Sequence, residues 1–118
     1  MAITAAQAAS DKKAQDILVL DMRDVFVLTD YFIICSVKTD RQVGSIRKAV
    51  EERLAAVGVK PARREGERHK LWVLLDYLDI VVHIFRQEER DYYEIERLWK
   101  DAPVVEWEKE PEEASTPK

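Results

Sequence analysis

Four short apolar runs constrain the fold of this 118-residue chain more than any other feature. They are Ile17–Leu20, Tyr31–Val37, Leu71–Leu75 and Ile80–Phe85. The first two do not alternate polar with apolar residues, as is typical of β-strands covered on both faces. The other two are rich in branched and aromatic residues, which favour strands. Each run is far shorter than the ~20 residues that a membrane-spanning helix needs. We therefore expect one domain built around a covered β-sheet.

The segment after Val37 predicts a helix most clearly. Thr39 can accept a hydrogen bond from the first helical turn, and Gln42 can reach back to Thr39, which together form a capping box. Gly58 stands where a left-handed residue ends a helix, with Pro61 shortly beyond it. Steps of three and four residues define one apolar stripe, which comprises Val43, Ile46, Val50, Leu54 and Val57.

Two further helices are predicted nearer the ends of the chain. The first covers Thr4–Ala14, where alanine is frequent and Thr4 and Gln7 have capping-box spacing. Its apolar face is thin, so we expect it to bury little. The second covers Gln87–Lys100. Its stripe comprises Tyr92, Ile95, Leu98 and Trp99, and its i,i+4 charge pairs are Arg90–Glu94 and Glu96–Lys100.

The polar stretch Pro61–Lys70 contains Gly66, which predicts a turn, and part of the stretch is predicted to pair as an edge strand. Asp76–Asp79 is short enough for a hairpin turn between two strands. The order of elements is then helix, strand, strand, helix, edge strand, strand, strand, helix. This order predicts an α/β fold with a mixed sheet flanked by helices.

The net charge of −4 is concentrated at the C-terminus. Residues 106–118 hold five Glu and two Lys, so they carry −3 and leave the other 105 residues at −1. A nearly neutral body has no global field that attracts nucleic acid. We predict a folded domain over residues 1–102 and a mobile, acidic, proline-containing tail over residues 103–118.

Few residues have the spacing that catalysis or cofactor binding needs. Cys35 is the only cysteine, which excludes an internal disulfide framework, and its apolar strand favours a core role over that of a nucleophile. Gly44, Gly58 and Gly66 lie too far apart for a phosphate-binding loop. No catalytic residue, metal or cofactor is predicted. The first ten residues lack the features of a signal peptide, so we expect a cytoplasmic protein.

Titratable residues near the hairpin allow more than one interpretation. His83 shares a strand face with Val81 and Phe85, and we expect a hydrogen-bonded or surface histidine rather than a metal ligand. Asp76 and Asp79 have the chemistry to chelate Mg²⁺, but turn formation explains both more simply.

Two other groups near the hairpin stay open. Trp72 and Phe85 either fill the core of the sheet or anchor a partner, because large aromatic residues suit both roles. Arg63, Arg64 and Arg68 form either a solvated loop or a contact to RNA phosphates at the rim of a larger interface.

Three motifs together resemble the ribosomal silencing factor (RsfS) family, also called the Iojap family. They are AQDILVLDMRD, LTDYFIICSVKTDRQV and REGERHKLWVLLDYLDIVVHIFRQEERDYYEIERLW. The match is ordered, correctly spaced and extends from Asp11 to Trp99. The chain has Val37 and Leu78 where many members have glycine, and Leu78 adds a bulky group to the predicted hairpin.

The resemblance implies a fold related to nucleotidyltransferases, without transferase chemistry. A nucleotidyltransferase uses a Gly-Ser pair ahead of its metal-binding acids. Here Ser36 follows Cys35, and Gly44-Ser45 lies inside the predicted helix.

The resemblance also implies a partner, ribosomal protein number fourteen of the large subunit. Binding there would sterically block joining of the small subunit and repress translation under nutrient limitation. Carried over by position, the contact surface comprises Trp72, Leu74, Asp76, Tyr77, Leu78 and Asp79. We add Arg63, Arg64 and Arg68 as peripheral contacts to ribosomal RNA, and self-association of the free protein as a homodimer. The alternatives are a general RNA-binding module and a nucleotidyltransferase-like protein that acts in ribosome assembly.

Overall fold

The computed structural model describes residues 1–108, which fold around one mixed five-stranded sheet. Strands β2 and β5 pair in parallel and the other neighbours are antiparallel, which confirms the predicted α/β fold with a mixed sheet. The order across the sheet is β1 (Gln15–Asp21), β2 (Tyr31–Val37), β5 (Ile80–Arg86), β4 (Trp72–Asp76) and β3 (Arg63–Glu65). The predicted edge strand is β3.

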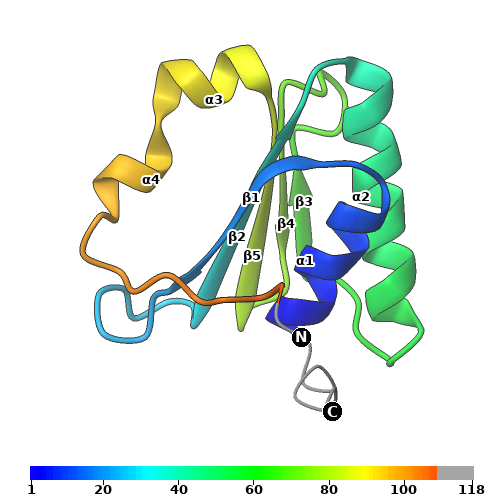
Figure 1. Ribbon diagram of the computed structural model, residues 1–118. Coiled ribbons are helices and arrows are strands. Elements are labelled where there is room, and N and C mark those ends of the chain that lie inside the picture. The colour runs from blue at the N-terminus through cyan, green and yellow to red at the C-terminus, as the bar shows by residue number, and fades with distance from the viewer. Residues whose placement is uncertain (109–118) are drawn as a thin grey trace, which may run out of the picture.

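Helices α1 (Ala2–Asp11) and α2 (Asp40–Ala55) cover one face of the sheet and enclose the main core (Figure 1). The predicted capping box is present, because Thr39 accepts from the Gln42 amide and Gln42 accepts from the Thr39 amide. The stripe is buried through Leu54, but Val57 lies beyond the helix and is 66% exposed. The side chains of the sheet that enter this core include Val19, Ile33, Cys35, Val73, Leu75, Ile80, Val82 and Ile84.

Helix α1 differs from its prediction in both its start and its packing. It begins at Ala2, so Thr4 lies inside the helix and does not cap it. Its alanines also bury far more than expected, since Ala5, Ala6, Ala8 and Ala9 have no exposed surface. Small side chains let the helix backbone lie close to the sheet and to α2, which compensates for their small individual area.

The C-terminal helical segment is broken into α3 (Gln87–Tyr93) and α4 (Ile95–Leu98), on the opposite face of the sheet (Figure 1). Glu94 between them has a left-handed φ of 44°. The prediction of one helix with one apolar stripe was therefore wrong, because Tyr92 and Leu98 are exposed and only Ile95 is buried. Ile95 and Trp99 join a smaller second core with Leu20, Met22, Phe32, Ile34, Phe85 and Ala102.

Arg90 explains the break. Its side chain is buried, and its guanidinium donates to the backbone oxygen of Asp16 at 2.6 Å and to the hydroxyl of Ser36 at 3.1 Å. It also pairs with Glu96 at 3.3 Å, which lies beyond the break. Glu94 instead pairs with Arg97. The predicted Arg90–Glu94 pair is thus replaced by contacts to Asp16, Ser36 and Glu96, and residues six apart such as Arg90 and Glu96 do not share a face of a straight helix.

The chain after Ala102 continues along the outer edge of β1. The Asp21 amide donates to the Pro103 oxygen, and the Val105 amide donates to the Val19 oxygen, both at 2.8 Å. Val105 and Trp107 pack against the main core. Residues 103–107, which were predicted to belong to the mobile tail, therefore lie against the domain. The rest of the predicted tail, residues 109–118, lies outside the described residues.

Candidate partner-binding surface

The sheet face that α1 and α2 leave free is only half covered by other elements. Helix α3 packs mainly on β5 and β2 and touches β4 through Tyr93, so most of the β3–β4 half lies beyond it. Trp72, Leu74 and Asp76 alternate along β4 and point away from the main core, whose β4 members are Val73 and Leu75. All three are half-buried. We call this surface, formed by Leu28, Arg63, Trp72, Leu74 and Asp76, the open face.

Trp72 packs against the sheet and keeps part of its surface exposed. Its indole N–H donates to Nδ1 of His83 at 3.1 Å, and its ring stacks on Phe85 with the centroids 4.6 Å apart. It also contacts the ring of Tyr93, with centroids 5.0 Å apart. Phe85 is fully buried and is a core residue, whereas Trp72 keeps part of its ring accessible. Trp72 is therefore held rigidly in a position where a partner can contact it.

A mostly apolar hollow on the open face is lined in part by Leu74 and Asp76 of β4. Arg63 and Asp76 close one side of it with an ion pair whose N and O atoms are 3.0 Å apart. The hollow has a volume of about 220 Å³ and is lined by Phe26, Leu28, Thr29, Phe32, Arg63, Leu74, Asp76, Val81 and His83. Such a concave apolar surface with a few polar groups suits a protruding side chain of another molecule.

The loop of residues 22–30 exposes further apolar side chains near the open face. It is tied to the β4–β5 hairpin because the Asp30 amide donates to the Asp79 oxygen at 2.9 Å. Val27 is 95% exposed and Leu28 74%, while Leu78 at the hairpin is 64% exposed. Our sequence reasoning treated residues 23–30 as a connector and missed Val27 and Leu28. The apolar run Val25–Leu28 could have indicated this exposed surface, because it belongs to no predicted helix or strand.

The structure separates the remaining predicted contact residues. Tyr77 is buried in the main core, where desolvation raises the pKa of its hydroxyl to about 12. Leu78 follows with a left-handed φ of 74°, a conformation that suits glycine. The Asp76 carboxylate accepts from the Leu78 amide at 2.8 Å, which confirms a turn-forming role for Asp76. Asp79 is exposed. Tyr77 therefore packs under the hairpin in the main core, whereas Leu78 and Asp79 are exposed on the hairpin surface.

The three arginines do not form one patch. Arg64 makes two hydrogen bonds to Glu51 of α2, at 2.8 and 3.0 Å, so its side chain is on the helical side of the sheet. Arg63 faces the opposite way, toward Asp76. Arg68 is exposed in the loop after β3. The ion pairs of Arg63 and Arg64 weaken the case for a basic RNA-binding surface here.

Burial shifts the pKa values of two groups inside the protein. Burial lowers the pKa of His83 to about 3, so the imidazole is neutral, and it raises the pKa of the Cys35 thiol to about 12. The Ser36 hydroxyl is occupied, since it accepts from Arg90 and donates to the Gln15 oxygen at 3.4 Å. Within residues 1–108, no three His, Cys, Asp or Glu side chains gather as metal ligands, and no helix is long and apolar enough to cross a membrane.

Comparison with known proteins identifies the family. A family model described as "Ribosomal silencing factor during starvation" matches residues 1–118. The chain belongs to the RsfS family. The RsfS protein of Bacillus subtilis is 43% identical over 101 residues, which cover 86% of each chain. The RsfS protein of Halalkalibacterium halodurans is 39% identical over 104 residues, covering 88% of this chain and 89% of the relative.

Solved structures agree with this membership. A crystal structure of a protein from Chromobacterium violaceum has a TM-score of 0.80 and 36% identity, and the match covers 82% of this chain and 81% of that one. A structure from Bacillus halodurans has a TM-score of 0.77 and 37% identity, with 87% and 93% covered. The chloroplastic Iojap protein of maize is 32% identical over 89% of this chain, which spans 46% of that longer protein. The RsfS family is thus associated with silencing of ribosomes during starvation.

Proposed function

We propose that this protein binds the large ribosomal subunit through ribosomal protein number fourteen and sterically blocks joining of the small subunit, which represses translation when nutrients are limited. The observation that carries the proposal is the open face, an accessible surface of the sheet with a rigid indole, an apolar hollow and a charged rim. Family membership supplies the ribosome as the target. The compartment is then the cytoplasm, where the ribosomes are.

The contact surface that we propose is centred on Trp72, Leu74 and Asp76, with Leu78 and Asp79 at the hairpin. Binding energy at interfaces is concentrated in a few anchored aromatic and apolar side chains, surrounded by polar groups. Trp72 meets this description because its neighbours already hold it in place. Leu28 extends the apolar surface across the hollow. The open face therefore needs little reorganisation before it binds.

Silencing by this route requires no turnover. A protein seated on the joining face of one subunit excludes the other subunit by its volume, and the outcome follows from concentrations and dissociation constants. A standard interface of about 1,600 Å² in total is sufficient for stable, specific binding. The same exposed apolar side chains would promote homodimer formation when the ribosome is absent, and Arg63 and Arg68 would serve as peripheral contacts to ribosomal RNA.

The test is to mix the protein with separated ribosomal subunits and sediment the mixture. The unmodified protein should reduce the joined-ribosome peak and migrate with the large subunit. Leu74→Asp should weaken binding by at least tenfold, because it places an unpaired charge in the contact. Val57→Asp is the matched control, since Val57 is an exposed apolar residue after α2, outside the open face. An unchanged joined peak at saturating protein would refute the proposal, and equal losses in both variants would remove the open face from it.

A general RNA-binding protein is the alternative outcome. In that case, binding to free RNA should fall steeply as salt concentration rises, and Leu74→Asp should have no more effect than Val57→Asp.

A further inference from the structure

We propose that residues 103–107 act as a strap that closes the β1 edge of the sheet and prevents a second copy of the chain from pairing with that edge. The proposal does not depend on ribosome binding. It rests on the different ways in which the two edges of the sheet are protected.

The β3 edge is protected by its own sequence. This strand has only three residues, Arg63, Arg64 and Glu65, all charged and exposed. Short, charged edge strands resist pairing with another chain, because pairing would bring charged side chains together and offers few backbone hydrogen bonds. The β3 edge therefore needs no cover.

The β1 edge has fewer of these protective features, because its charged residues, Asp16 and Asp21, lie toward its two ends. This strand has seven residues, and its centre, Ile17–Leu20, is apolar and contains no lysine, arginine or proline. Its irregular pairing with β2 lies between Gln15 and Leu18, at one end, so the rest of the strand remains regular. A strand of this kind with a free row of backbone groups is a template for edge-to-edge association.

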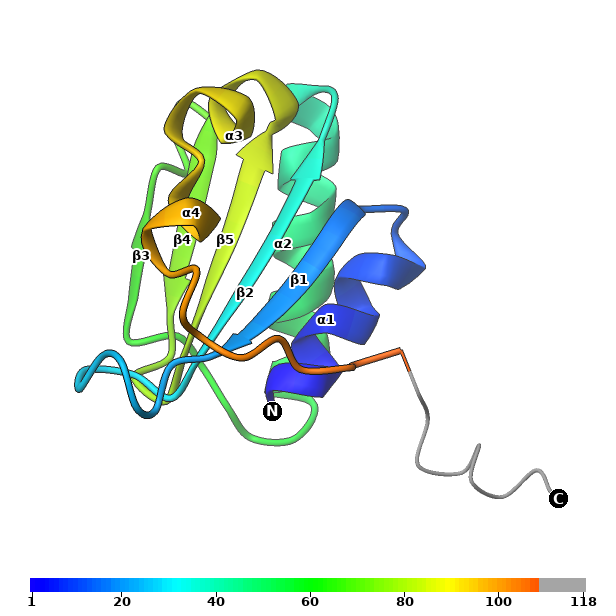
Figure 2. The ribbon, with the colours of Figure 1, turned by 60° about the vertical axis from the view of Figure 1, so that its left-hand side comes forward.

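The strap occupies those groups. Leu20 and Val104 form an antiparallel bridge, in which the Val19 oxygen and the Asp21 amide are both hydrogen-bonded to the strap. The indole N–H of Trp107 donates to the next outward oxygen, that of Ile17, at 3.3 Å. Figure 2 shows the segment crossing beside β1 and α1. Three outward backbone groups of β1 are thus hydrogen-bonded to three strap residues, Pro103, Val105 and Trp107.

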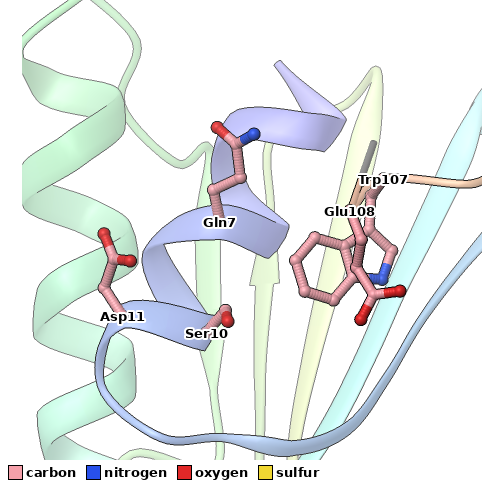
Figure 3. Close-up of a pocket in the computed structure, with 5 residues that line it drawn as sticks. All are labelled: Gln7, Ser10, Asp11, Trp107 and Glu108. Carbon is pink, nitrogen blue, oxygen red and sulfur yellow. The ribbon is translucent and has the colours of Figure 1, made fainter. Parts of the chain in front are cut away.

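Trp107 anchors the far end of the strap. Its ring packs against the main core, and Figure 3 shows it beside α1, facing the side of the helix that bears Gln7 and Ser10. Val105, two residues earlier, is half-buried and also packs against the core, whereas Val104 is 63% exposed. The alternation is that of an added edge strand with one face toward the core.

The test compares three chains by sedimentation velocity over a range of concentrations. The first is the full chain, the second ends at Glu108 and keeps the strap, and the third ends at Ala102 and lacks it. We expect the third chain alone to show additional self-association, at concentrations at least tenfold lower than the other two. Val105→Pro in the full chain should act in the same direction, because proline cannot donate to the Val19 oxygen.

Amide hydrogen exchange locates the contact. The Asp21 amide should exchange slowly in the full chain and rapidly in the shortest chain at low concentration, and protection should return as that chain associates. A shortest chain that folds but associates no more than the full chain would overturn the proposal, as would association without renewed protection at Asp21. Failure of ribosome binding would leave both readouts unaffected.

Discussion

At the scale of single residues, the pair of Trp72 and His83 decides how the open face is built. Nδ1 of His83 accepts a hydrogen bond from the Trp72 indole, and the imidazole packs edge-on against Phe32 with the ring centroids 4.7 Å apart. These surroundings keep the imidazole neutral. The sequence predicted a hydrogen-bonded or surface histidine, and the structure shows the first of these, on the predicted strand face, because strand periodicity determines which residues share a face. It left the role of Trp72 open, since periodicity says nothing about which half of a face the helices cover.

Substitutions at Trp72 should separate packing from hydrogen bonding. Trp72→Ala is expected to lower the free energy of unfolding by about 3 kcal/mol, because it removes a large packed ring. Trp72→Phe keeps much of the ring but leaves Nδ1 of His83 without its donor, so we expect a loss of about 1–2 kcal/mol. Urea denaturation measures both values. Equal losses for the two variants would show that the indole N–H, rather than the ring, is what stabilises this site.

His83 should also make stability depend on pH. Its pKa is about 3 in the folded protein, below the ordinary value of 6.5. Between these two pKa values, the unfolded state binds a proton at His83 that the folded state does not bind. The contribution of His83 to the free energy of unfolding is therefore complete above about pH 6.5. It is lost as pH falls toward 3, by up to about 1.4 kcal/mol per pH unit.

The control for this pH dependence is His83→Asn, whose side-chain oxygen can still accept from Trp72 but does not titrate. Carboxylates common to both proteins cancel when their unfolding free energies are compared between pH 7 and pH 4. Parallel stability curves for the two proteins over that range would contradict a buried, neutral His83.

At the scale of elements, local signals predicted those parts of the fold that local contacts determine. The capping box of Thr39 and Gln42 located the start of α2, and apolar runs located the strands. The straight helix over Gln87–Lys100 failed because Arg90 reaches β1, β2 and Glu96, residues that no local pattern connects to it. The burial of Tyr77 was missed for a similar reason, since the direction of a hairpin residue depends on the turn.

The break between α3 and α4 predicts an unusual stabilising substitution. Glu94 has a positive φ, which costs a residue with a side chain more than it costs glycine. Its ion pair with Arg97 is largely exposed and contributes little. Glu94→Gly is therefore expected to raise the free energy of unfolding by about 0.5–1 kcal/mol. Glu94→Ala is the matched control, because it loses the ion pair but keeps the strain. Thermal denaturation should rank glycine above glutamate, and a ranking of alanine above glycine would contradict the argument.

At the scale of the whole molecule, the two faces of the sheet differ in how completely they are covered. Helices α1 and α2 complete the main core on one face, and the other face leaves its β3–β4 half accessible. The sequence predicted the layers and, through the family resemblance, three residues of the open face on β4. It did not predict the strap, because a segment of five residues is too short for its alternation to be recognised without the edge that it covers.

This architecture predicts no response to nucleotides. The Ser36 hydroxyl is occupied by Arg90 and Gln15, and the Asp76 carboxylate is paired with Arg63. Addition of nucleoside triphosphates with Mg²⁺ should therefore leave the melting temperature unchanged, whereas binding to the folded state would raise it. A shift that depends on both nucleotide and Mg²⁺ would favour the nucleotidyltransferase alternative.

The complete burial of Cys35 has a practical consequence for following this protein in solution. A thiol that is inaccessible and whose pKa is raised to about 12 does not react with ordinary maleimide dyes. Ser45 is exposed on α2, which covers the face of the sheet opposite the open face. A Ser45→Cys variant would thus carry a single fluorophore at a defined position. The dye would report binding and dissociation of a partner at the open face without blocking that face.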